Sequence, residues 1–185
     1  MSGGANTPVE NLPGKPPAGE HGALSCGKEL SFSPAAEARF QKLQTRYPTK
    51  QAALLPTLWI AQEEWGWISR EAVDYVGSRL DLSSAFVWGV VTFYTMYNRA
   101  PVGKHLIQVC TSISCHLNGA EEVYHACRKK LGDLKPGETS ADGKFTVIED
   151  ECLAQCDKAP AVMVNGDDHE RITLDKLDAF LAELK

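Results

Sequence analysis

Four cysteines in two short loops constrain this chain more than any other feature. Cys110 and Cys115 have C-x4-C spacing, and Cys152 and Cys156 follow after 36 residues with C-x3-C spacing. Four converging thiolates make a tetrahedral sulfur site for zinc or for iron–sulfur iron. Structural zinc favours tighter C-x2-C pairs, whereas a [2Fe–2S] cluster needs two thiolates on each of two irons. The spacing therefore favours a [2Fe–2S] cluster, while a zinc module and a plain dithiol or disulfide stay open as alternatives.

The composition is that of a soluble protein with one or two domains. Of the 185 residues 43% are hydrophobic, and the net charge of −5 disfavours a nucleic-acid partner. No apolar run approaches the roughly 18 residues that a membrane span requires. The first twenty residues lack the apolar core of a signal peptide, so we expect a cytoplasmic protein. Because cytoplasmic thiols are kept reduced, six cysteines there indicate metal or redox chemistry.

The first hundred residues predict a disordered tail, residues 1–32, followed by a four-helix bundle over residues 33–100. The tail is rich in glycine and proline and can bury little apolar surface. Hydroxyl residues stand at N-cap positions before the helices. The expected helices run from Pro34 to about Thr45, from about Thr49 to Gly66, from Ser69 to about Leu80, and from Ser83 or Ser84 to about Tyr97. Pro56 predicts a kink or a late start in the second helix.

All four tryptophans fall inside this helical stretch, and we expect them to contribute mostly to its core. They are Trp59, Trp65, Trp67 and Trp88. So small a bundle cannot bury all four, and an exposed aromatic residue on a soluble protein commonly marks a partner surface.

From residue 101 onward the pattern changes to short β-prone runs that alternate with helices. A helix is expected to begin after Gly119 and another at about Thr173, and Asn165-Gly166 is a strong hairpin signal. The expected strands are His105–Val109, Phe145–Ile148, Ala161–Val164 and a short edge strand near Glu170–Ile172. Cys127 falls on the apolar stripe of the first helix and is expected in the core, while Cys26 is expected to be a spare exposed thiol.

Five ordered motifs give the chain a family resemblance. They are RYPTKQAALLPTLWIAQEEWGWIS, VVTFYTMYNRAPVGKHLIQVC, SCHLNG, LKPGETSADGKFTV and ECLAQCDKAPAVMVN, and they span residues 46–165. In these motifs the chain resembles the small thioredoxin-like [2Fe–2S] subunit, known as the E subunit, of the NADH-oxidising module of bacterial respiratory complex I. The resemblance implies an α+β protein in which the helical bundle precedes a thioredoxin-like [2Fe–2S] ferredoxin domain, residues 101–185.

The resemblance also implies a function. It predicts an electron-transfer subunit of NADH:quinone oxidoreductase, with Cys110, Cys115, Cys152 and Cys156 as the cluster ligands and no catalytic residues of its own. FMN and NADH are expected on a flavin-bearing partner subunit, because the chain has neither a G-x-G-x-x-G motif after a strand nor a P-loop. Further iron–sulfur subunits are expected partners. The complex would hold the chain peripherally at the inner membrane, without a membrane span of its own.

Three positions depart from the family pattern. Ala154 stands where glycine is expected, Gln155 where a small residue is usual, and Ser114 where many relatives have proline. These positions shape the hydrogen bonds and solvent access at the sulfur atoms, so they affect the reduction potential. His116, beside a ligand, is a further candidate for tuning the cluster.

Other functions are compatible with the same cysteines. The nearest alternative is the equivalent subunit of an NAD-linked hydrogenase or formate dehydrogenase. A zinc-binding module is a second, and a dithiol oxidoreductase is a third, although the C-x-x-C motif typical of that class is absent.

Overall fold

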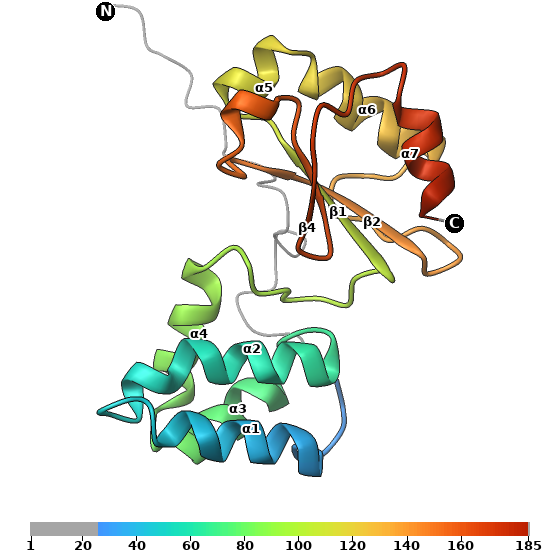
Figure 1. Cartoon of the computed structure of the whole chain (residues 1–185). Coiled ribbons are helices and arrows are strands. Elements are labelled where there is room, and N and C mark those ends of the chain that lie inside the picture. Colours follow the sequence, from blue (N-terminus) through green and yellow to red (C-terminus); the bar gives the residue numbers. More distant parts are fainter. Residues whose placement is uncertain (1–25, 185) are drawn as a thin grey trace, which may run out of the picture. The chain divides into compact units, whose positions relative to one another are not determined.

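The computed structural model describes residues 26–184, so most of the predicted tail, residues 1–25, lies outside the described residues. The described chain divides into two compact units, residues 26–101 and residues 102–184 (Figure 1). The first contains helices, and the second contains a sheet with helices packed on it. Each unit has its own hydrophobic core.

Local capping signals determine where most helices of the first unit begin. The hydroxyl groups of Ser33, Ser69 and Ser83 each accept a backbone N–H three residues further on, as N-caps do. The helices are α1 (Pro34–Gln44), α2 (Leu54–Trp65), α3 (Arg70–Leu80) and α4 (Ser84–Phe93), with a 3₁₀ turn, η1 (Gln51–Ala53), before α2. They share one core, to which Leu58, Val76 and Val87 contribute fully buried side chains. The bundle arrangement itself stays a prediction.

Two helix boundaries have different causes, a local signal for the start of α2, as predicted, and tertiary contacts for the end of α4. The α-helical part of α2 starts late, at Leu54, so that Pro56 falls in its first turn, where no backbone N–H is needed. The fourth predicted helix, α4, ends at Phe93 instead of Tyr97. The reason is that α2 binds the following segment: Gln62 donates to the Met96 carbonyl and accepts from the Asn98 N–H, and the Tyr97 hydroxyl donates to the Leu55 carbonyl.

None of the four tryptophans is fully buried, so the expectation that some would stay exposed is confirmed. The Trp59 side chain is 41% exposed, and the other three are half-buried. Aliphatic residues fill much of the core, together with Phe32, Phe40 and Tyr97. Phe32 stacks on Trp65 with ring centroids 5.3 Å apart, which places ordered packing just before α1.

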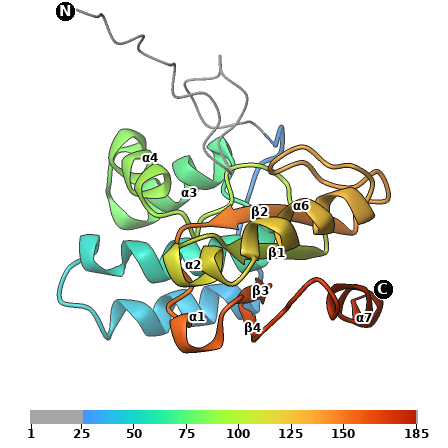
Figure 2. The same cartoon turned by 90° about the horizontal axis from the view of Figure 1, so that it is seen from above.

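The second unit is built on a four-stranded mixed sheet. Its strands are β1 (His105–Cys110), β2 (Phe145–Asp150), β3 (Val162–Val164) and β4 (Asp167–His169). The sheet order is β2-β1-β3-β4, with β1 and β2 parallel and the other pairs antiparallel (Figure 2). The connection from β1 to β2 carries α5 (Ile113–Leu117) and α6 (Ala120–Lys130), and the chain ends in α7 (Leu177–Glu183). This strand order and these helices form a mixed α/β domain, as expected.

Three elements of this unit differ from the prediction. The edge strand pairs at Asp167–His169, earlier than predicted, because the two-residue Asn165-Gly166 turn lets pairing resume immediately. The last helix begins at Leu177 instead of Thr173, since the preceding residues form a turn in which the Lys176 N–H donates to the Thr173 carbonyl. Leu174 is therefore 52% exposed. Helix α5 was not predicted.

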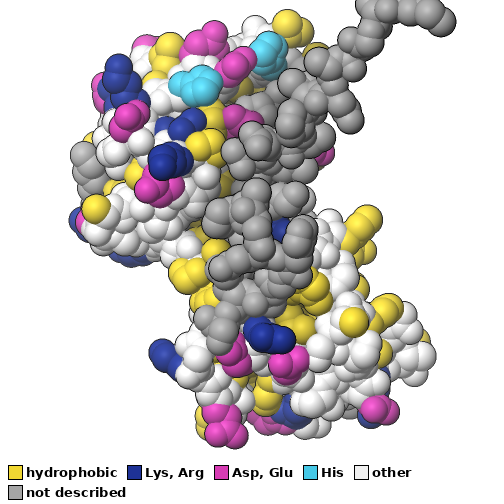
Figure 3. All heavy atoms as spheres, turned by 180° about the vertical axis from the view of Figure 1, so that it is seen from behind, with side chains coloured by type: hydrophobic (Ala, Val, Ile, Leu, Met, Phe, Trp, Pro, Cys, Tyr) yellow, Lys and Arg dark blue, Asp and Glu magenta, His cyan; other side chains and the backbone are white. Residues whose placement is uncertain are grey.

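Charged side chains of both signs are interspersed over the surface visible in Figure 3. Among residues 26–184 no helix is long and apolar enough to cross a membrane.

Candidate iron–sulfur site

The parallel pairing of β1 with β2 brings the two cysteine loops to one edge of the sheet. Cys110 is the last residue of β1 and pairs in register with Asp150, the last residue of β2. The Thr111 N–H extends this pairing by donating to the Asp150 carbonyl at 3.0 Å. Cys152 follows two residues later. Since parallel strands end at the same edge, the loops Thr111–Cys115 and Glu151–Cys156 both leave the sheet there.

The first loop supplies two buried thiols. Cys110 is 3% exposed and Cys115, within α5, is 2% exposed. Burial raises the pKa of the Cys115 thiol, and a hydrogen bond with the Cys110 side chain raises it further, while the Ala161 backbone hydrogen bond opposes the shift. Cys110 and Cys115 therefore lie within direct reach of each other.

The second loop supplies two exposed thiols. The Ala154 N–H donates to the Cys152 Sγ at 3.4 Å. Cys156 begins the 3₁₀ turn η2 (Cys156–Lys158), which lies against α5. An electrostatic interaction with Cys156 also raises the pKa of the Cys115 thiol. The contact of η2 with α5 brings Cys156 to the helix that carries Cys115, and Cys152 stands in the same loop as Cys156.

The donor set fits a [2Fe–2S] cluster in its chemistry. Two loops bring one pair of thiols each, the first pair buried and the second exposed, and such a cluster takes two thiolates per iron. A backbone N–H already directed at one of the sulfur atoms supplies the kind of outer contact that stabilises a thiolate. In the described part of the chain, no three His, Cys, Asp or Glu side chains are grouped as ligands of a single metal ion.

The three positions that depart from the expected pattern, Ala154, Gln155 and Ser114, differ in backbone conformation and hydrogen bonding. Ala154 has φ = 58°, a left-handed conformation that favours glycine, the residue that the family resemblance leads us to expect there. The amide oxygen and nitrogen of Gln155 are both buried without a hydrogen-bond partner among the described residues. The Ser114 carbonyl accepts from the Asn118 side chain at 2.7 Å, which ties this position to the end of α5.

The remaining cysteines belong to neither of these loops. Cys127 is 1% exposed in the core, where burial raises its pKa to about 12, so its predicted core role is confirmed. Cys26 is half-buried rather than fully exposed: its backbone N–H donates to Glu71, and the Ser69 hydroxyl donates to its Sγ at 3.4 Å. Contacts with α3 thus partly cover a thiol that the sequence indicated as free.

His116 is exposed and interacts with a carboxylate, not with a thiol. Its Nδ1 lies 3.4 Å from Glu121, which also approaches His125 at 3.8 Å. A tuning role for His116 stays a prediction. The only sequence signal for the buried Gln155 amide was that glutamine stands where a small residue is usual. Helix α5 was missed because it is too short to leave a periodic pattern.

Comparisons with known proteins place the chain in a family. Residues 40–185 match the model of the thioredoxin-like [2Fe-2S] ferredoxins. The E subunit of the NADH-quinone oxidoreductase of Rickettsia bellii is 41% identical over 143 residues, which cover 76% of this chain and 85% of the relative. The corresponding E subunit of Escherichia coli is 37% identical over 156 residues, which cover 84% and 93%.

A solved structure supports the fold. The structure of an air-oxidised NAD+-reducing [NiFe]-hydrogenase aligns with a TM-score of 0.62 at 21% identity. The alignment covers 71% of this chain and 22% of the hydrogenase chain, so the likeness concerns the fold alone. By the family match and by its relatives, this chain belongs to the thioredoxin-like [2Fe–2S] ferredoxin family.

Proposed function

We propose that this chain is the electron-transfer E subunit of an NADH-quinone oxidoreductase, respiratory complex I. The observation that carries the proposal is the parallel pairing of β1 with β2, from which both cysteine loops leave the sheet at the same end. It occurs in a chain that is 41% identical to an E subunit over 85% of that subunit's length. The enzymatic activity belongs to the complex, and this chain's part in it is to hold an electron carrier.

Each residue of the site has a defined task in this function. Cys110 and Cys115 would form one ligand pair and Cys152 and Cys156 the other; when bound, the [2Fe–2S] cluster supplies one-electron redox chemistry. The burial of Cys110 and Cys115 excludes water from their sulfur atoms. The Ala154 N–H stabilises negative charge at Cys152. The exposed second pair leaves this side of the site open to a partner.

The partners follow from what the chain lacks. A nucleotide-binding motif is absent from its sequence, so NADH and FMN would bind to a flavin-bearing partner subunit. Residues 33–100 would form a helical bundle domain that docks against that subunit. Residues 101–185 would form the cluster domain. Further iron–sulfur subunits would continue the electron path, and the assembled complex would hold the chain peripherally on the cytoplasmic face of the inner membrane.

Anaerobic purification tests the cluster directly. We expect a reddish-brown protein with sulfur-to-iron absorption bands and an EPR signal after reduction, in contrast to the colourless protein that zinc or free thiols would give. Docking is tested by co-purification with the flavin-bearing subunit, using one truncation that lacks residues 2–30 and one that lacks residues 2–100. The chain that lacks only residues 2–30 should still bind. The docking role of the helices fails if the longer truncation folds, holds its cluster and binds as tightly as the full chain.

An NAD-linked hydrogenase is the second candidate host. The hydrogenase likeness supports only a shared fold, since it rests on 21% identity. The chains that co-purify with this protein decide between the hosts: quinone-module subunits support complex I, and a nickel–iron subunit supports a hydrogenase.

A further inference from the structure

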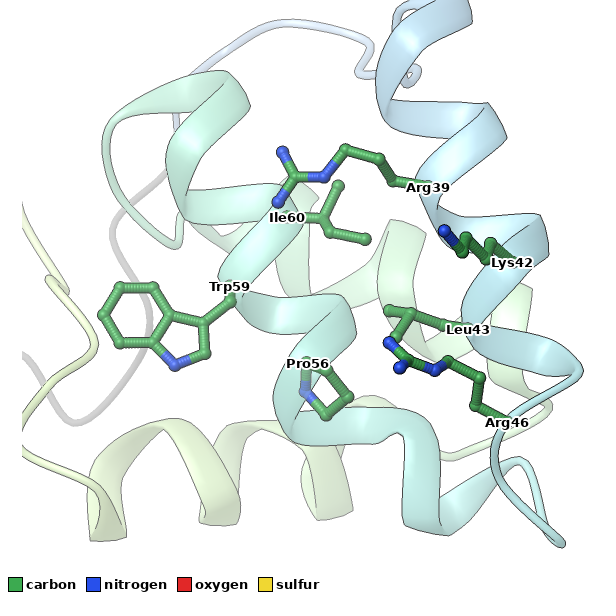
Figure 4. A pocket seen from close by; sticks show the side chains of 7 residues that line it. All are labelled: Arg39, Lys42, Leu43, Arg46, Pro56, Trp59 and Ile60. Carbon is green, nitrogen blue, oxygen red and sulfur yellow. The ribbon is translucent and has the colours of Figure 1, made fainter.

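A groove runs between α1 and α2 in the helical unit, with a volume of about 360 Å³ (Figure 4). The spacing of the sequence produces it, because residues three and four apart share a helix face. The residues that line it are Arg39, Lys42, Leu43 and Arg46 from the α1 side, and Pro56, Trp59 and Ile60 from α2. No residue of the cluster site takes part in it.

The groove has an apolar floor with cationic groups along one side. Ile60 is buried and Pro56 is half-buried, while Trp59 stands 41% exposed. In Figure 4 the Arg39 side chain extends over Ile60, and the Arg46 side chain extends toward Pro56. An occupant would therefore meet apolar and cationic surface at the same time.

Two of the three cations are available to an external carboxylate. Arg39 is paired with Glu63 at 2.5 Å. Lys42 and Arg46 form no ion pair with a carboxylate among residues 26–184. The groove thus carries a net positive charge on a chain whose overall charge is −5. Electrostatic complementarity selects an anionic occupant.

Trp59 is the first of a row of aromatic rings that contact one another. Trp59 contacts Tyr97 with ring centroids 6.0 Å apart, Tyr97 contacts Tyr94 at 6.4 Å, and Tyr94 contacts Phe93 at 5.0 Å. The Phe93 side chain is 76% exposed. Tyr97 is buried in the core, so the exposed rings of this row are those of Trp59, Tyr94 and Phe93. Exposed aromatic side chains beside a cationic groove fit a length of polypeptide better than a small anion, because peptides that bind in grooves use apolar anchor side chains.

We infer that this groove binds an acidic segment of a partner protein. Carboxylates of the segment would pair with Lys42 and Arg46, and an apolar side chain would lie against Pro56 and Trp59. The partner's identity rests on the proposed function: the segment belongs to the flavin-bearing subunit. The helical unit would thus dock through this groove, and its docking would depend on the positive charges of Lys42 and Arg46.

The test measures binding of the full-length, cluster-loaded chain to the flavin-bearing subunit. The double variant K42E/R46E reverses both available cations and should weaken binding at least about tenfold, since like charges then face each other. The matched control K28E/R70E makes the same change of net charge at two other exposed positions of the unit and should bind like the unchanged chain. K42R/R46K keeps both charges and should also bind normally. Cluster absorbance and melting temperature verify that every variant folds.

Salt dependence gives a second readout. The affinity of the unchanged chain should fall between about 0.05 M and about 0.3 M salt more steeply than that of K42E/R46E. A photo-reactive phenylalanine analogue at Trp59 should crosslink to a segment rich in Asp and Glu, which mass spectrometry identifies. A crosslink to a segment without acidic residues overturns the inference, as does K42E/R46E binding as tightly as K28E/R70E. If the unchanged chain itself does not bind the flavin-bearing subunit, the proposed partnership falls, and this inference falls with it.

Discussion

The backbone N–H of Ala154 donates to the Sγ of Cys152 at 3.4 Å from a left-handed conformation with φ = 58°. For a residue with a Cβ this conformation costs about 1 kcal/mol or more. The loop therefore keeps the hydrogen bond to the sulfur at the expense of backbone strain, where glycine would keep the same donor without it.

Replacing Ala154 with glycine should separate these two effects. We expect Ala154→Gly to stabilise the folded chain by about 0.5 kcal/mol, because relief of strain exceeds the greater chain entropy of glycine in the unfolded state. It should also shift the reduction potential without changing the cluster content. Thermal melts and a potentiometric EPR titration of both forms check this. Equal midpoints within error would show that position 154 does not tune the centre.

Serine replacement tests the ligand set. Substitution at Cys110, Cys115, Cys152 or Cys156 should remove or strongly alter the reduced-state EPR signal, because each iron has only two protein thiolates. Cys127→Ser and Cys26→Ser are the controls and should keep the signal, although the first buries a hydroxyl and lowers stability by about 1–3 kcal/mol. Loss of the signal in Cys127→Ser, with its survival in one of the other four, would contradict the assignment.

The Gln155 amide offers a prediction about stability. Both of its polar atoms are buried without a partner among the described residues, and an unsatisfied buried group costs about 1–3 kcal/mol. Gln155→Ala removes that cost and should raise the free energy of unfolding by about 1 kcal/mol, as measured by denaturant titration of the cluster-loaded protein. Gln155→Glu, which places a charge in the same space, should do the opposite. A less stable Gln155→Ala variant would mean that the amide has a partner in the loaded protein.

The ion pair between Glu37 and Arg79 predicts an acid-dependent stability. Hydrogen bonds from Arg79 and Gln41 lower the pKa of Glu37 from 4.5 to about 2, so the folded state holds the carboxylate more strongly than the unfolded state does. Its stabilisation is present above pH 4.5 and is lost as the pH falls toward 2. Because both side chains are partly exposed, the effect is about 1 kcal/mol.

Glu37→Gln should therefore destabilise the chain at pH 7 and change little at pH 2. The measurement is the difference in unfolding free energy between the variant and the unchanged chain across this range. Glu138→Gln, at an exposed carboxylate of the other unit, is the control. A pH-independent difference for Glu37→Gln would exclude the ion pair as its cause.

Prediction from the sequence succeeded where a local signal fixes the outcome. Ser33 and Ser69 are N-caps, Gly66 ends α2 in a left-handed conformation, and Asn165-Gly166 forms the hairpin. It failed where contacts distant in sequence decide. Gln62 of α2 binds the segment after Phe93 and so ends α4 early.

The site shows the same division. The spacing of Cys110, Cys115, Cys152 and Cys156 indicated two thiol pairs, but only the register of β1 with β2 shows why the two loops leave the same sheet edge. The burial of Cys115, the left-handed conformation of Ala154 and the isolation of the Gln155 amide are properties of the folded chain. A linear pattern does not contain that information.

The two separate cores have a calorimetric consequence. Within residues 26–184, no buried residue belongs both to the core around Leu58 and to the core around Ile107. Heating should therefore produce two overlapping unfolding transitions. The total calorimetric enthalpy should then exceed the van't Hoff enthalpy. Cys110 and Cys115 belong to the core around Ile107. Loss of iron should therefore lower the temperature of one transition and leave the other in place, because the binding free energy of a metal centre is folding free energy only for the unit that holds it.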